Sequence, residues 1–323
     1  MMKMFWLSNP LANHLFGPLA TIILGLFVLA ALALLAFQVG RMTLPILAIP
    51  TPAPAVSNQV LWQRYLTWAI IAPLFLIAVL SGPLAVALLC AFLCWQGGRE
   101  YADLMKLPAS HGAALVLSGW ATLAAALIVG SAALVAAPVL AFFGWSLVAL
   151  RSVKGEQSVE KRFGAALVGL WGSLYIGWLP AYLVALSVSA SPGLVLAVGL
   201  GVALSDVGAF CCGKALGGPR LAPTLSPNKT WGGVAGNFLG AALALALLTF
   251  ALPDFQLWQR CLLALAIGVG SIWGDLLESL LKRQGGVKDA GRMLPGFGGL
   301  LDRIDSLLMA APLVYAIALL ITK

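Results

Sequence analysis

Residues 17–39 read GPLATIILGLFVLAALALLAFQV, an apolar run without a single charge. A run of this length can cross the hydrocarbon core of a bilayer as one helix. A cleaved signal peptide is the alternative interpretation. However, the run is longer than the usual apolar core of a signal, and the positive charge of Arg41 follows it. We therefore expect a membrane-spanning helix here.

Similar runs continue along the chain. Ser81-Gly82-Pro83 divides one long apolar stretch, and Gly130-Ser131 and Ser191-Pro192 divide two others. The uncharged runs then fall at about 17–39, 66–80, 83–97, 113–129, 132–150, 163–189, 192–212, 233–251, 259–281 and 304–321. The sequence predicts an all-α polytopic membrane helix bundle with about ten transmembrane helices (nine to ten).

The composition excludes the other structural classes. Of 323 residues, 61% are hydrophobic and 9% are charged, and the mean hydropathy is +1.00. Soluble domains carry about 25% charged residues, so soluble globular, disordered and collagen-like chains are excluded. A membrane β-barrel would show alternating strands of roughly ten residues, which are shorter than these runs.

The basic residues indicate how the chain is oriented. Sixteen of the 19 Lys and Arg residues fall in five segments: 41–65, 97–112, 151–162, 213–231 and 282–303. Two apolar runs separate each segment from the next, so the positive-inside rule places all five in the cytoplasm and both termini outside. A bacterial inner membrane is expected, because no organelle-targeting segment is visible. The net charge of +8 favours anionic lipid or a phosphate-bearing substrate, whereas the scattered placement argues against nucleic acid.

Two regions are predicted. Residues 1–200 hold the N-terminal transmembrane helices with a Pro-rich cytoplasmic connector at 41–65, and residues 201–323 hold a C-terminal transmembrane catalytic region with a signature at 275–306. The five cysteines are odd in number and lie mostly in apolar runs. We interpret them as small buried apolar groups without disulfides or a metal pair.

Ionisable residues within the spans mark the candidate site. Asp206, Asp275 and Glu278 are acids inside apolar runs of the C-terminal third, whereas no acid lies inside a predicted span of the first 200 residues. Asp275, Glu278, Ser279 and Lys282 are spaced to share one helix face. We expect this stripe to face a wet cavity near the cytoplasmic end. A buried Asp–Lys pair that only locks helices together is the structural alternative.

A glycine-rich loop follows that helix. Residues 284–305 combine glycines with the cations Lys288, Arg292 and Arg303, and Asp302 and Asp305 open the last helix. Carboxylates, clustered cations and glycine backbone are what Mg²⁺-bound polyphosphate requires.

A second basic loop, Ser226-Pro227-Asn228-Lys229-Thr230-Trp231, leads into a span, where Ser226 is expected to cap a phosphate-binding helix start. The following Gly232, Gly236 and Gly240 are spaced by four residues, which is typical of helix packing.

These segments also carry a family resemblance. The elements are Ser279-Leu280-Leu281-Lys282-Arg283, Lys288-Asp289, Leu294-Pro295-Gly296, Gly298-Gly299 and Asp302-Arg303-Ile304-Asp305. Together they closely resemble the signature of the phosphatidate cytidylyltransferase (CDP-diacylglycerol synthase) family. Residues 226–231, Ser205–Phe210 with Gly213-Lys214, and Glu100-Tyr101 are similar to further elements of that family. Good resemblance covers residues 205–306, and the N-terminal half is similar only as generic membrane helices.

Three positions depart from the family pattern. Phe297 stands where the family usually has His, Gly232 where it has Glu, and Asn228 where Lys is common. Phe297 removes a titratable donor and Gly232 removes a carboxylate, so the chain resembles a divergent member whose substrate could differ.

The resemblance implies Mg²⁺-dependent transfer of a cytidylyl group from CTP to phosphatidate, giving CDP-diacylglycerol and pyrophosphate in phospholipid biosynthesis. It implies Asp275, Asp302 and Lys282 as catalytic residues, with Asp275, Asp302 and Asp305 holding one or two divalent ions, optionally beside a monovalent cation. The implied substrate-binding residues are Ser226, Lys229, Thr230, Ser279, Arg283, Lys288, Asp289, Arg303 and Asp206. The acyl chains would enter from the bilayer, and a homodimer is left open.

Several other functions stay open. CTP could serve another lipid phosphate or donate phosphate to a lipid alcohol. A transporter using Asp206, Asp275 and Glu278 is a different class, but it would not need the dense loop at 282–305. A third class is a catalytically inactive scaffold that binds lipid or nucleotide. A CDP-alcohol phosphatidyltransferase is disfavoured because the signature of that family begins with Asp-Gly, and no Asp in this chain is followed directly by Gly.

Overall fold

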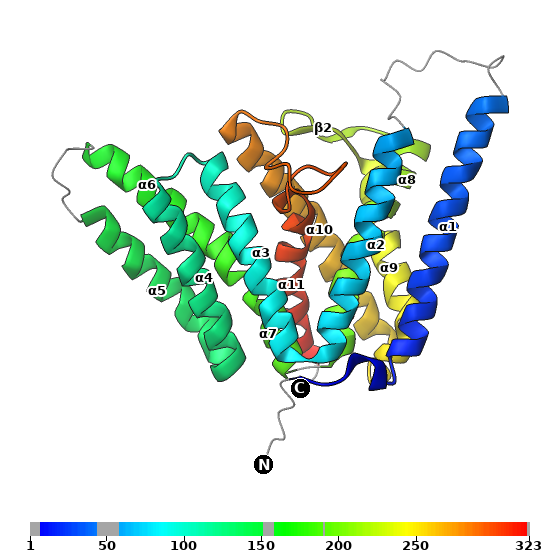
Figure 1. Ribbon diagram of the computed structural model, residues 1–323, viewed down its shortest axis with the longest axis horizontal. Helices are drawn as coiled ribbons and strands as arrows, with labels where there is room; N and C mark the ends of the chain where they lie inside the picture. Colours follow the sequence, from blue (N-terminus) through cyan, green and yellow to red (C-terminus); the bar gives the residue numbers. More distant parts are fainter. Residues whose placement is uncertain (1–6, 44–57, 151–157, 190, 322–323) are drawn as a thin grey trace.

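The computed structural model describes residues 7–43, 58–150, 158–189 and 191–321. It is a bundle of long helices that run roughly side by side (Figure 1), with one short antiparallel hairpin. The elements are η1 (Pro10–Ala12), α1 (Phe16–Thr43), α2 (Asn58–Ser81), α3 (Pro83–Leu104), α4 (Ala109–Val129), α5 (Ser131–Leu150), α6 (Val159–Gly172), η3 (Ser173–Trp178), α7 (Ala181–Ser189), α8 (Pro192–Ala215), β1 (Arg220–Ala222), β2 (Ser226–Thr230), α9 (Trp231–Leu247), η4 (Thr249–Ala251), α10 (Leu257–Gly285) and α11 (Leu301–Ile321).

The helices coincide with the predicted apolar runs. Eight helical stretches of the described chain are long and apolar enough to cross a membrane, and α6, η3 and α7 form one of them. The other two predicted runs are α9, which is 17 residues long, and α3, which carries charges in its last turns. The chain is therefore a polytopic membrane protein built from helices, as its composition predicts.

Two predictions about the N-terminal half need correction. The run predicted over 83–97 ends too early, because α3 continues to Leu104 and buries Glu100, which is 5% exposed. The connector predicted over 41–65 lies partly outside the described residues, and its last part, 58–65, already belongs to α2.

The cysteines differ from the prediction as well. Cys90 and Cys94 are buried and Cys212 is half-buried, whereas Cys211 and Cys261 are exposed. An outer face in a membrane meets lipid, so a small apolar side chain does not have to be buried in the protein there. All five cysteines are free.

Small residues allow the C-terminal helices to approach closely. A Cβ on Gly208 of α8 would overlap the carbonyl oxygen of Gly236 in α9, and one on Gly240 would overlap that of Leu204. The predicted packing role of Gly236 and Gly240 is thus confirmed. A Cβ on Gly274 of α10 would likewise overlap the carbonyl oxygen of Asp305 in α11, so the two helices that carry Asp275, Glu278, Asp302 and Asp305 meet backbone to backbone.

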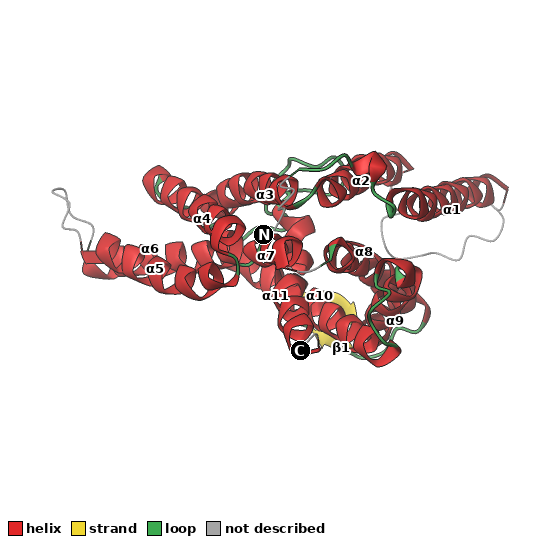
Figure 2. Ribbon diagram, turned by 90° about the horizontal axis from the view of Figure 1, so that it is seen from below, coloured by secondary structure: helices red, strands yellow, loops and turns green. Residues whose placement is uncertain are grey.

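The two described ends of the chain lie at one end of the bundle. Ser8 donates its backbone N–H to Ser81, at the end of α2, and Gln259 of α10 donates to the carbonyl of Ile321. The hairpin and the loop between α10 and α11 lie at the opposite end (Figure 1). Seen along the helices, α8 to α11 form a compact group, and α1 stands apart from it (Figure 2).

Candidate active site

Three carboxylates converge where α10 meets α11. Oxygen atoms of Asp275, Glu278 and Asp305 all lie within 4.8 Å of one another. Glu278 and Asp305 are buried, at 1% and 6% exposure, and the side chain of Asp275 is 42% exposed. Three acids this close repel one another unless a cation lies among them.

Hard oxygen donors in this arrangement suit a divalent cation such as Mg²⁺. The buried Oε1 of Glu278 has no hydrogen-bond partner among the described residues, and an unpaired buried carboxylate oxygen is costly. The residues present therefore fit a metal ion with Asp275, Glu278 and Asp305 around it. Glu278 was not predicted as a ligand, although its place on the polar stripe was recognised.

Two lysines partly neutralise the acids. Lys229, at the end of β2, lies 2.5 Å from Asp275. Lys282, one turn after Glu278 on α10, lies 2.5 Å from Glu278 and 2.9 Å from Asp302. The contact between Glu278 and Lys282 is the one expected from their spacing of four residues.

Asp302 holds the glycine-rich loop in place. Its Oδ2 accepts the backbone N–H groups of Ala290 and Gly299, at 3.0 and 2.8 Å, and its Oδ1 accepts a hydrogen bond from Lys282. Both oxygens thus have protein partners, and Asp302 lies outside the three-acid cluster. Its role as a metal ligand stays a prediction.

Glu100 reaches the same loop from α3. Sequence reasoning identifies it only as part of a family element and does not predict it as a site residue. Its two carboxylate oxygens accept the N–H groups of Leu300 and Leu301, at 3.0 and 2.8 Å, and Gln96 donates to Oε1 at 2.9 Å. These N–H groups belong to the start of α11, where a helix has unpaired donors and a positive dipole end. The buried positions Leu93, Gly97, Glu100 and Leu104 repeat every three or four residues, which is the signal that could have extended the predicted helix.

Asp206 joins the site from α8. Ser271 donates to Asp206 at 3.3 Å, and Asn237 of α9 donates to Ser271 at 3.2 Å. Asp206 also lies close enough to Asp275 and Asp305 to interact with both electrostatically. Three helices besides α11 thus contribute polar groups.

The predicted phosphate-binding residues of the second loop lie on β2 and at the start of α9. Ser226 and Lys229 belong to β2, and the hydroxyl of Thr230 accepts the N–H of Gly233 at 3.2 Å. Thr230, not Ser226, therefore caps α9, because a strand separates Ser226 from the helix. Arg283 of α10 donates to the carbonyl of Leu225 at 3.3 Å and so joins this hairpin to α10.

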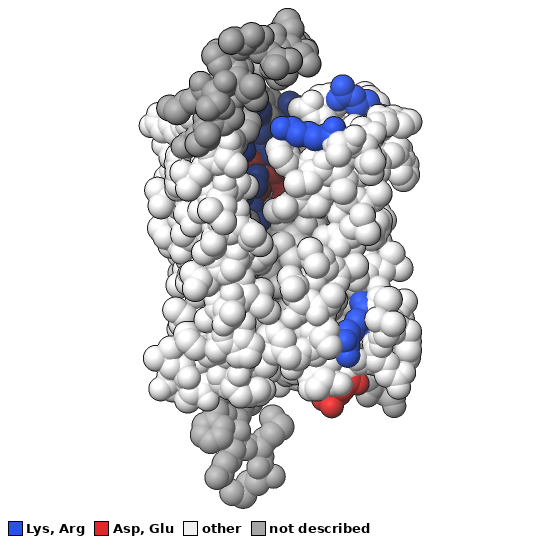
Figure 3. All heavy atoms as spheres, turned by 90° about the vertical axis from the view of Figure 1, so that its right-hand side faces the viewer, with Lys and Arg blue, Asp and Glu red and all other residues white. Residues whose placement is uncertain are grey.

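The remaining predicted residues lie on α10, in the loop that follows it and at the start of α11. Lys288, Asp289 and Arg303 are exposed, and Ser279 is buried on α10. Figure 3 shows the face on which α1 and α9 lie, where lysine, arginine and acidic side chains appear at the bottom of a hollow in the upper half of the molecule. Charged side chains are therefore visible from the side of the bundle as well as at its end.

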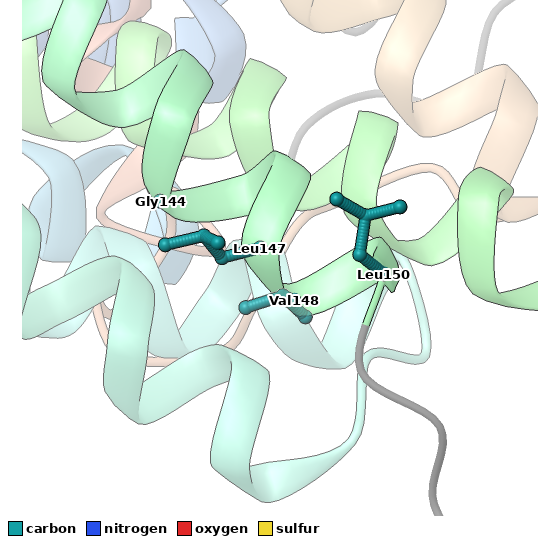
Figure 4. A pocket seen from close by; sticks show the side chains of 4 residues that line it. All are labelled: Gly144, Leu147, Val148 and Leu150. Carbon is teal, nitrogen blue, oxygen red and sulfur yellow. The ribbon is translucent and has the colours of Figure 1, made fainter.

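Two apolar pockets lie away from these charges. One, of about 440 Å³, lies at the end of α5 beside Leu147 and Leu150 (Figure 4). The other, of about 360 Å³, lies among α4, α5 and η3. No ionisable side chain lines either pocket, whereas the acid cluster combines carboxylates with lysines.

Comparison with known proteins gives a consistent assignment. A sequence model of the cytidylyltransferase family matches residues 62–321. A phosphatidate cytidylyltransferase of Mycobacterium leprae is 33% identical over 207 residues, which cover 60% of this chain and 65% of the relative. The Brucella suis protein of the same name is 48% identical over 111 residues, covering 34% of this chain and 41% of its own length. That of Pseudomonas aeruginosa is 42% identical over 141 residues, covering 39% and 47%. The chain thus spans less than two thirds of the length of each of these relatives.

Proposed function

The chain belongs to the cytidylyltransferase family, and from this premise we propose that it makes CDP-diacylglycerol and pyrophosphate from CTP and phosphatidate. A phosphate oxygen of phosphatidate forms a bond to the α-phosphorus of CTP. The bond from that phosphorus to the bridging oxygen of the β-phosphate breaks, and pyrophosphate leaves with the electron pair. The attacking oxygen is already ionised near neutral pH, so no protein base is required.

The observation that carries this proposal is the cluster of Asp275, Glu278 and Asp305 beside Lys229 and Lys282. Catalysis of phosphoryl-group transfer depends chiefly on positioning and on neutralising charge. An acid cluster suited to a cation, next to lysines that can bind phosphate, supplies both.

Mg²⁺ would be held by Asp275, Glu278 and Asp305, and when bound it would neutralise phosphate charge and orient the reacting groups. Asp302, whose Oδ1 accepts a hydrogen bond from Lys282, would be a further ligand. Lys229, Lys282, Arg283, Lys288 and Arg303 would bind the triphosphate and the lipid phosphate, together with Ser226, Thr230 and Ser279. Asp206 and Asp289 would position the metal or the nucleotide.

The charged end of the bundle would face the cytoplasm of a bacterial inner membrane, with both termini on the other side. CTP would then reach the site from water, and phosphatidate would enter from the bilayer through the lateral hollow (Figure 3). Residues 201–323 would form the catalytic region, with the N-terminal helices as its support.

Activity of the purified full-length protein tests the proposal. With phosphatidate, Mg²⁺ and CTP labelled at the α-phosphate, we expect labelled CDP-diacylglycerol. The variants Asp275→Asn and Asp305→Asn should lose activity by about a hundredfold or more, because each removes a charge from the reacting centre. Asp254→Asn is the matched control, since Asp254 is exposed in the turn before α10, far along the helix from Asp275. Full activity in Asp275→Asn would contradict the role of the cluster.

Phe297 favours one alternative, a different lipid acceptor, because the resemblance predicts His there. Screening phosphatidate, an isoprenoid-glycerol phosphate and a lipid alcohol with CTP labelled at the α- or γ-phosphate separates the cases. Transfer of the α-label to phosphatidate supports the proposal. Transfer of the γ-label to the lipid alcohol would contradict the proposal and would show that the protein is a CTP-dependent lipid kinase.

A further inference from the structure

The start of α2 forms hydrogen bonds with the glycine-rich loop between α10 and α11. Arg64 donates its Nε–H to the carbonyl of Gly296 at 2.8 Å, and Thr67 donates to that of Pro295 at 3.1 Å. Trp68 packs edge-on against Phe297, with ring centroids 6.5 Å apart. A helix more than two hundred residues away in sequence thus fixes the position of Phe297.

Phe297 in turn holds two arginines. The guanidinium carbon of Arg64 lies 5.4 Å from the centre of the Phe297 ring, and that of Arg303 lies 4.9 Å from it. The negative face of an aromatic ring attracts cations. The Phe297 ring therefore stabilises the guanidinium groups of Arg64 and Arg303, which would otherwise repel each other.

Among the described residues, neither arginine forms an ion pair with a carboxylate. In the part of the chain that the structure describes, the ion pairs of Asp275, Glu278 and Asp302 are all made with lysines. The Nε of Arg64 is committed to the Gly296 carbonyl, which leaves its terminal amino groups for an anion. Arg303 also lies close enough to Asp206 and Asp305 to interact with both, so an anion at this pair would lie beside the acid cluster.

The helix face below Arg64 is apolar. Trp68, Ile71 and Phe75 follow Arg64 at spacings of four, seven and eleven residues, which places them on the same face of α2. A Cβ on Gly199 of α8 would overlap the ring of Phe75, so α2 and α8 meet below the arginine. A cation beside an apolar helix face suits an amphipathic ligand with a phosphate head and hydrocarbon chains.

We propose that Arg64 and Arg303, held on the ring of Phe297, form a phosphate-binding subsite for the phosphate monoester of the lipid acceptor. This inference rests on the proposed function and adds Arg64, from outside the C-terminal region, to the substrate-binding residues. Arginine suits the task because its planar group can donate two parallel hydrogen bonds to one phosphate.

The kinetic test compares Arg64→Gln with the wild-type full-length protein. We expect the KM for phosphatidate to rise about tenfold or more, the cost of losing one charge-assisted hydrogen bond, while the KM for CTP stays unchanged. Arg64→Lys and Phe297→Leu should lie in between, because each keeps one part of the subsite. Arg99→Gln is the matched control, since Arg99 stacks on Trp95 at 5.2 Å in α3, and it should behave as the wild type. A raised KM for CTP alone, or no change in either KM, overturns the assignment.

A binding test separates this inference from the proposed function. Dioctanoyl phosphatidate should raise the melting temperature of the detergent-solubilised wild-type protein but not that of Arg64→Gln, and dioctanoyl phosphatidylcholine should affect neither. This result would support the subsite even if no CDP-lipid were formed. Equal stabilisation by phosphatidylglycerol, a phosphate diester, would indicate a general site for anionic lipid and overturn the proposal. Equal stabilisation of both proteins by phosphatidate would exclude Arg64 as a ligand.

Discussion

The ammonium group of Lys282 lies between two buried carboxylates, 2.5 Å from Glu278 and 2.9 Å from Asp302. The side chains of both acids are 2% exposed, whereas that of Lys282 is 18% exposed. Removing one partner of a buried ion pair leaves an uncompensated charge away from water. Lys282 should therefore matter for stability as well as for substrate.

The variant Lys282→Met tests this. We expect it to destabilise the protein by about 3 kcal/mol or more, seen as a lower midpoint of heat-induced aggregation in detergent. The control Lys229→Met should change the midpoint little, because its partner Asp275 is 42% exposed and water compensates the loss. Adding Glu278→Gln to Lys282→Met should recover part of the stability. Equal destabilisation by the two lysine variants would contradict this account.

Local spacing was sufficient to predict some site residues and not others. The spacing of four residues on one helix predicts the Glu278–Lys282 contact, because successive turns bring such side chains together. It could not identify Glu100, whose hydrogen bonds reach across 200 and 201 residues of sequence. Nor could local spacing predict that Asp305, and not Asp302, belongs to the three-acid cluster. Which of two acids one turn apart faces α10 depends on how α11 is rotated.

At the scale of elements, uncharged runs predicted the helices well, because a bilayer leaves the backbone few alternatives to a helix. The end of α3 was missed because the charges at its last turns resemble a loop. The buried charge of Glu100 is tolerated because the N–H groups at the start of α11 neutralise it. In this way α3 sets the position of the helix that carries Asp302 and Asp305.

Glu100→Gln tests that positioning role. Gln keeps one acceptor but turns an amide NH₂ toward a backbone N–H, so the start of α11 should shift. We expect kcat to fall about tenfold and the Mg²⁺ concentration needed for half-maximal rate to rise. Tyr101→Phe is the neighbouring control, because its hydroxyl donates to the carbonyl of Val168 at 2.8 Å and not to the loop. That variant should lower stability only. An unchanged Mg²⁺ requirement in Glu100→Gln would leave Glu100 a purely structural residue.

At the scale of the whole molecule, the basic residues of the candidate site and the described ends of the chain lie at opposite ends of the bundle. The described ends of the chain lie at one end of the bundle, and the hairpin and the loop between α10 and α11 lie at the other (Figure 1). The latter end holds Lys229, Lys282, Arg283, Lys288 and Arg303. The positive-inside rule predicts that such an end faces the cytoplasm, where CTP would be available for the proposed reaction.

Thiol labelling in a bacterial host tests this orientation. The background protein has all five native cysteines replaced, which is necessary because Cys211 and Cys261 are exposed. Val287→Cys then reports on the loop after α10, and Leu257→Cys on the start of α10, at residues 41% and 76% exposed. An impermeant maleimide added to cells with a permeabilised outer membrane should label Leu257→Cys at once and Val287→Cys only after lysis. The reverse pattern would place the acid cluster on the side without CTP, and the proposed reaction could not then occur in the cell even if the purified protein catalysed it.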